Sequence, residues 1–87
     1  MARLLLVDGR QDMCTEWRAA LEARRHEVSV AANASFVLTM LERNPPDVIV
    51  SHVVLEDMSG CELCAIVRTD PMARQIRFIL LTETRKG

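Results

Sequence analysis

Short apolar runs alternate with helical patterns along the whole chain. Four runs are rich in aliphatic residues and predict strands buried in a sheet: 3–7, 27–31, 47–52 and 78–82. Between them, apolar residues recur at helical spacing in three segments: 11–24, 34–43 and 61 to about 69. The order β-α-β-α-β-α-β predicts one α/β domain over residues 1–87, built on a parallel sheet with right-handed crossovers.

The sequence also predicts the local roles of three residues. Asn33 precedes the second helical segment and is a favourable N-cap. Arg25 stands in the turn after the first helical segment, where glycine is preferred, so we expect backbone strain of about 1 kcal/mol there. Trp17 lies on the apolar stripe of the first helical segment and is predicted to belong to the core.

Composition limits the classes of function. Of the 87 residues, 49% are hydrophobic and 26% are charged, and 11 basic against 12 acidic residues leave a net charge of −1. This balance argues against binding to nucleic acid or to a membrane surface. No segment approaches the roughly 18 apolar residues that span a bilayer. An odd number of cysteines without disulfide-framework spacing suits a reducing compartment, so we expect a cytoplasmic protein.

Polar residues follow three of the predicted strands. Asp8 and Gly9 follow the first strand, and His52 ends the third. Thr82 and Glu83 lie at the end of the fourth. In open parallel sheets, binding sites form beyond the carboxyl ends of the strands, where the strand order switches. We therefore expect these residues to share one pocket.

Four stretches of the chain resemble the response-regulator receiver domain. LLLVD at 4–8 looks like its first strand, and PDVIV at 46–50 like the approach to its phosphoacceptor strand. Leu55, Met58 and Gly60, followed by ELC at 62–64, look like the loop and helix after the acceptor. DP at 70–71 through ILLT at 79–82 looks like the run into the fourth strand. The resemblance covers essentially the whole chain and implies a flavodoxin-like doubly wound sheet.

The resemblance also implies a chemistry that the residues do not match. Receivers use an aspartate as phosphoryl acceptor, with Mg²⁺ on an acidic pair and with a lysine and a hydroxyl beside it. By position, the acceptor is His52 and the second acid is Gly9, while Asp8 and the hydroxyl of Thr82 are retained. Glu83 replaces a residue that is usually small, and the lysine would lie beyond the end of this chain. We therefore predict a phosphorylation-independent pseudo-receiver, with no metal, no cofactor and no enzymatic activity.

Several residues admit more than one interpretation. His52 fills the acceptor pocket as a neutral ring bonded to Asp8 or to the backbone, or forms a pH-sensing pair with Asp8, or is itself the acceptor of a phosphorelay, or ligates a metal. Glu83 is either solvated or imitates a bound phosphoryl group. Cys61 and Cys64 form a C-x-x-C pair at a helix start, which indicates packing or else a redox or metal-responsive module.

A receiver normally continues with a helix, a strand and a last helix beyond the point where this chain ends. Without them, four apolar residues form an edge strand: Phe78, Ile79, Leu80 and Leu81. Such an edge favours pairing with another chain, so we expect a homodimer or a higher assembly with the fourth strand or its neighbours in the interface, whether the chain is complete or part of a longer protein. The expected partners are a kinase, an output domain or another signalling protein, with no nucleic acid and no membrane.

Overall fold

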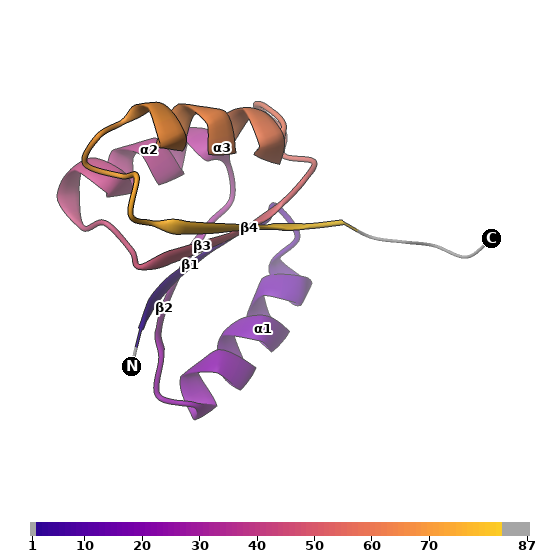
Figure 1. Cartoon of the computed structure of the whole chain (residues 1–87). Coiled ribbons are helices and arrows are strands. Elements are labelled where there is room, and N and C mark those ends of the chain that lie inside the picture. Colours follow the sequence, from indigo (N-terminus) through magenta and orange to yellow (C-terminus); the bar gives the residue numbers. More distant parts are fainter. Residues whose placement is uncertain (1, 83–87) are drawn as a thin grey trace.

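The structure is a computed structural model that describes residues 2–82 (Figure 1). Four strands form one sheet: β1 (Arg3–Val7), β2 (Glu27–Ala31), β3 (Val48–His52) and β4 (Arg77–Leu81). Three helices connect them: α1 (Gln11–Ala23), α2 (Ala34–Arg43) and α3 (Gly60–Thr69). All pairings are parallel, in the order β2-β1-β3-β4. The predicted element order and parallel sheet are confirmed, with ends shifted by one residue in α1, α3, β3 and β4.

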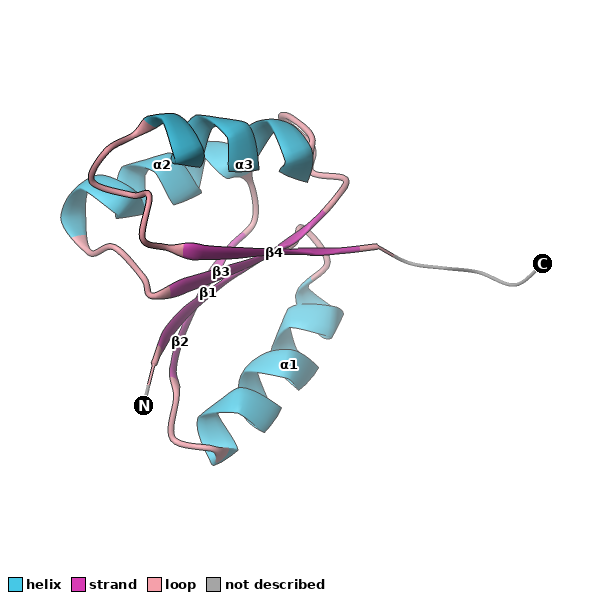
Figure 2. Cartoon of the chain, in the orientation of Figure 1, coloured by secondary structure: helices cyan, strands magenta, loops and turns pink. Residues whose placement is uncertain are grey.

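The two faces of the sheet are covered unequally. In Figure 2, α2 and α3 lie on one face and α1 lies alone on the other. Alternate residues of β1 point to opposite faces, so Leu5 and Val7 join the large core under α2 and α3, while Leu4 and Leu6 face α1. Within residues 2–82, the buried cluster on the α1 face is the smaller of the two and consists of Leu4, Leu6 and Val28, so part of that face is thinly covered.

Side-chain caps explain where two of the helices begin. Asn33 accepts the N–H of Phe36 at 3.0 Å, which confirms the predicted N-cap of α2. Ser59 caps α3 by accepting the N–H of Glu62 at 3.0 Å. The Ser-x-x-Glu spacing of residues 59–62 is typical of a helix N-terminus, and the sequence prediction did not include it. None of the helices within residues 2–82 has the length and apolar character required to cross a bilayer.

The turn between α1 and β2 is strained, as predicted. Arg25 has a φ of 66°, which lies in the left-handed region, and within residues 2–82 it is the non-glycine residue with a positive φ. A side chain with a Cβ atom pays about 1 kcal/mol to adopt this conformation. The connection is therefore made at some cost in backbone energy.

The prediction that Trp17 belongs to the core is wrong. Its side chain is 44% exposed, whereas Cys14, three residues earlier on α1, is buried. Helix α1 packs mainly against β1 and β2, so its buried stripe is centred on Cys14 and not on Trp17. The indole instead lines an apolar cavity of about 150 Å³ together with Leu6, Met13 and Val50.

Strand β4 forms one edge of the sheet, as expected. It pairs with β3 on one side, with Ile49 opposite Phe78 and Val50 opposite Ile79. Ile79 is 47% exposed and Leu80 is 37% exposed, although both are strongly apolar. The edge therefore combines outward-facing backbone groups with uncovered aliphatic surface.

Candidate functional site

The carboxyl ends of β1, β3 and β4 meet at one edge of the sheet. Val7 pairs with Ser51, so Asp8 and His52 come next on neighbouring strands. His52 in turn pairs with Leu81, the residue before Thr82. An open groove is lined by four of the five residues predicted to share a pocket: Asp8, Gly9, His52 and Thr82. The fifth, Glu83, lies outside the described residues.

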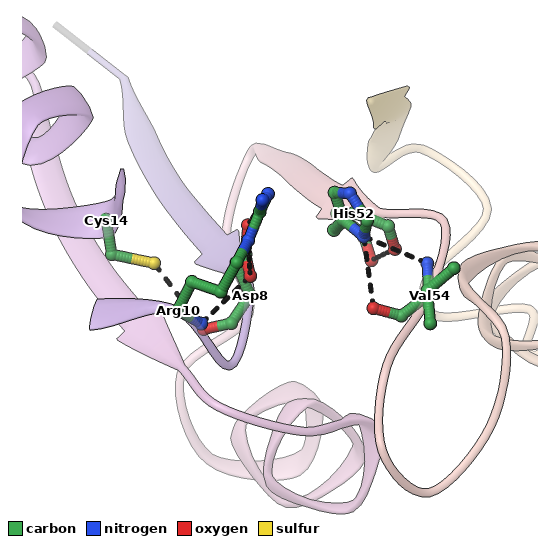
Figure 3. A network of polar contacts seen from close by, with 6 residues as sticks. Asp8, Arg10, Cys14, His52 and Val54 are labelled. Carbon is green, nitrogen blue, oxygen red and sulfur yellow. Dashed lines mark hydrogen bonds and ion pairs between the residues drawn. The ribbon is translucent and has the colours of Figure 1, made fainter. Parts of the chain in front are cut away.

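Asp8 is held by Arg10, a residue that the sequence reasoning missed. The Arg10 backbone N–H and Nε donate to Oδ1 of Asp8 at 2.9 and 3.3 Å, and Nη2 donates to Oδ2 at 3.1 Å. Figure 3 shows the arginine side chain folded back over the carboxylate. An aspartate that bonds the backbone two residues further on is a common turn feature, so the spacing itself was a weak signal.

The charge of this pair is fixed by its surroundings. Burial by itself raises the pKa of Asp8, but the hydrogen bonds and positive charge of Arg10 outweigh it and hold that pKa below its usual 3.8. The same side-chain hydrogen bond raises the pKa of the Arg10 guanidinium above its ordinary value. Nearby, burial raises the pKa of the Cys14 thiol, which donates to the backbone oxygen of Asp8 at 3.5 Å. Asp8 is therefore a carboxylate at neutral pH, and Cys14 is a protonated packing residue.

His52 is half-buried at the end of β3 and is tied to the following loop. Its Nδ1 lies 3.0 Å from the backbone nitrogen of Val54 and 3.1 Å from the carbonyl oxygen of the same residue (Figure 3). When Nδ1 is unprotonated it accepts the Val54 N–H, and when it is protonated it donates to the carbonyl. The backbone therefore offers Nδ1 a partner in either state, which corresponds to the predicted bond between His52 and a backbone group.

The described residues do not gather a metal site. Within residues 2–82, no group of three or more His, Cys, Asp or Glu side chains is arranged to hold a metal ion. Cys61 is exposed and Cys64 is half-buried, and both are free thiols. The packing interpretation therefore fails for Cys61, while Cys64 partly contacts the protein interior.

Asp57 connects the loop after β3 to the start of α2, and the sequence reasoning missed it. Its Oδ1 accepts the N–H of Ala34 at 3.0 Å, and its Oδ2 accepts both the N–H and the hydroxyl of Ser35 at 3.0 Å. Donation from the Ala34 and Ser35 backbones lowers the pKa of Asp57 below 3.8. The carboxylate thus satisfies helix N–H groups that have no partner within the helix and places negative charge at its N-terminus.

We expect Asp57→Ala to lower the urea midpoint of unfolding by more than the neighbouring control Glu56→Ala does. Because the folded-state pKa of Asp57 is lowered, its stabilisation is present above the unfolded value of about 3.9 and is lost as pH falls through the folded value. The gap between the midpoints of the wild type and Asp57→Ala should therefore close below about pH 4. A gap that is the same at neutral and acidic pH would contradict the role of the carboxylate.

Known proteins share this fold and sequence pattern. The profile of the response regulator receiver domain matches residues 4–86. The chain is 35% identical over 81 residues to response regulator PleD of Caulobacter vibrioides, covering 93% of this chain and 18% of PleD. It is 36% identical over 83 residues to transcriptional regulatory protein AfsQ1 of Streptomyces coelicolor, covering 94% and 35%. The solved structure of chemotaxis response regulator CheY4 of Vibrio cholerae superposes with a TM-score of 0.90, at 29% identity and covering 98% and 72%.

Together with the profile match, the parallel sheet flanked by helices, with polar residues at its carboxyl edge, assigns the chain to the receiver class of signalling domain. The chain belongs to the response regulator receiver domain family of two-component signalling, and the predicted flavodoxin-like fold is confirmed. It spans only 18% of the length of PleD and 35% of that of AfsQ1.

Proposed function

We propose that this domain is a phosphorylation-independent receiver, a pseudo-receiver that regulates a partner through protein contacts and catalyses no reaction. The observation that carries the proposal is His52, an imidazole at the end of β3 where the receiver chemistry needs a carboxylate acceptor. Phosphoryl transfer to this family of sites depends on a nucleophilic carboxylate and a cation beside it.

The surroundings of His52 support the same proposal. Gly9 contributes no side chain at the position of the second acid, and the carboxylate of Asp8 is already bound by Arg10. In addition to Asp8, the chain retains the hydroxyl residue of the usual receiver site as Thr82, which is exposed. Several missing groups support phosphorylation independence more strongly than one substitution does, because the loss of each group by itself removes stabilisation of the transition state for phosphoryl transfer.

We expect no phosphoryl adduct when the chain is incubated with acetyl phosphate and Mg²⁺ and its intact mass is measured. A receiver with an aspartate acceptor serves as the positive control for the reagent. The variant His52→Gln separates the alternatives. A stoichiometric adduct that disappears in His52→Gln under non-acidic conditions would favour a phosphorelay through His52, and an adduct that persists would contradict the proposal altogether.

The proposed partner is another signalling protein. Receiver domains interact with kinases and output domains in signalling, and one relative of this chain is a transcriptional regulatory protein. For this domain we propose a kinase, an output domain or a similar protein as the partner, without direct contact to nucleic acid. A cytoplasmic location fits such partners and is part of the proposal.

We further propose that the isolated chain forms a homodimer through β4. The edge position of the strand and the exposed side chains of Ile79 and Leu80 support this, because two such edges satisfy each other's backbone groups when they pair. Pairing of β4 with its copy would join two four-stranded sheets into one continuous sheet.

Light scattering at micromolar concentration should give the mass of a dimer for the wild type and of a monomer for Ile79→Lys. A lysine on an edge strand blocks pairing by its charge and its need for water. The matched control is Ile66→Lys, which places the same charge at an isoleucine that is 40% exposed on helix α3 and is not part of the edge strand. A wild-type protein that is a clean monomer would refute the dimer.

A further inference from the structure

Arg10 engages the whole Asp8 carboxylate from only two residues away. Three donors of one residue reach both oxygens, and one of these donors is the backbone N–H that shapes the turn. A guanidinium is a rigid planar fork, so less freedom is lost for each hydrogen bond than with a lysine. The Asp8 side chain is only 16% exposed, so solvent and salt screen this pair less than they screen a surface ion pair.

A divalent cation at this edge of the sheet would need the same carboxylate. Mg²⁺ prefers an octahedral set of oxygen ligands, and the neighbouring Gly9 has no side chain to add to Asp8. To reach the carboxylate, the cation must displace the Arg10 guanidinium or stay beside its positive charge, and both outcomes are unfavourable. The described residues therefore do not fit Mg²⁺, because the Asp8 carboxylate is already bound by Arg10 and Gly9 supplies no second carboxylate.

We propose that Arg10 is a built-in counter-ion for Asp8 that excludes divalent cations from the pocket and fixes its charge. Arg10 is in this sense a positioning residue, since it acts on the pocket through Asp8. The biological meaning of this inference rests on the proposed phosphorylation independence. The Asp8–Arg10 pair in the loop after β1 would keep the same charge whether or not Mg²⁺ is available.

The glycine at position 9 makes the inference testable. A Cβ atom built there would meet the carbonyl oxygen of Ala32 at 3.6 Å, which is an ordinary contact. The variant Gly9→Asp is therefore sterically admissible and supplies a second carboxylate. In that background, a comparison of Arg10 with Arg10→Gln isolates the effect of the guanidinium on cation binding.

The probe is Mn²⁺, whose free-ion electron paramagnetic resonance signal falls on binding, and the emission of Trp17 in the adjoining cavity gives a second readout. We expect Gly9→Asp/Arg10→Gln to bind Mn²⁺ at least roughly tenfold more tightly than Gly9→Asp, a ratio equivalent to about 1.4 kcal/mol. The control Arg18→Gln in the same background breaks an exposed ion pair with Glu22 on α1 and should leave the affinity unchanged.

Equal Mn²⁺ affinity with and without the Arg10 guanidinium would overturn the inference, as would tight Mn²⁺ binding by the unmodified chain. Circular dichroism melting verifies that each variant is folded. If Arg10→Gln does not fold, Arg10→Met, which keeps an aliphatic stem without the charge, takes its place. The two proposals fail separately: a phosphoryl adduct on the wild type refutes the proposed function, whereas Mn²⁺ binding by the wild type without an adduct refutes only the role of Arg10.

Discussion

Gly60→Ala is expected to destabilise the domain by about 2–3 kcal/mol, because no room exists for a methyl group at this position. A Cβ atom would lie 2.5 Å from the carbonyl oxygen of His52, 2.9 Å from Cδ2 of Leu80 and 3.2 Å from Cα of Val53. Two of these atoms are backbone, and Gly60 is itself held there by its N–H bond to the Val53 carbonyl at 2.6 Å. The clash therefore cannot be relieved by turning one flexible side chain.

Helix propensity works in the opposite direction and makes this prediction sharp. Alanine is favoured over glycine inside a helix by up to about 1 kcal/mol, so without the clash the substitution would be neutral or stabilising. The matched control is Gly9→Ala, where the new atom meets only the Ala32 oxygen at an ordinary 3.6 Å. Urea unfolding of both variants gives the two free energies. A Gly60→Ala protein as stable as Gly9→Ala would show that the close approach of α3 to His52 is not real.

Ile49→Ala is expected to lower the free energy of unfolding by about 3–4 kcal/mol. Ile49 is the second residue of β3, has 0% of its surface exposed and belongs to the larger core beneath α2 and α3. Its removal leaves a cavity that the neighbouring side chains fill only in part. A domain of this size has about 4–13 kcal/mol of stability in total, so this single change removes a large share of it.

Ile66→Ala is the control for Ile49→Ala, because the same atoms are deleted from an isoleucine that is 40% exposed on α3. Its expected cost is about 1 kcal/mol, in proportion to the smaller area it buries. The two urea midpoints, measured under identical conditions, give the difference directly. Equal losses would mean that the core beneath α2 and α3 does not carry the stability of the domain.

Together, Gly60 and Ile49 connect stability with the site. His52 ends the strand in which Ile49 is buried, and its carbonyl oxygen packs against the first residue of α3 at Gly60. The imidazole therefore stands on a well-supported part of the fold, and not on a mobile surface loop. This support around His52 suits the proposed phosphorylation-independent role.

The sequence by itself determined the fold and part of the membership of the site. Aliphatic runs and helical spacing are local properties of the chain, and parallel strands must bring their carboxyl ends to one edge, so Asp8, His52 and Thr82 could be placed together without coordinates. The N-cap at Asn33 and the strained turn at Arg25 followed equally from local chemistry.

Only the tertiary structure decided which groups the site residues bind. Asp57 reaches the N-terminus of α2 from more than twenty residues away, a contact that depends on how the loop after β3 crosses the sheet edge. Trp17 is exposed because α1 packs against β1 and β2 through a stripe centred on Cys14, and periodicity alone does not determine which part of an apolar stripe faces the sheet. The hold of Arg10 on Asp8 depends on one side-chain rotamer and one turn, and it is the contact on which the proposed exclusion of divalent cations rests.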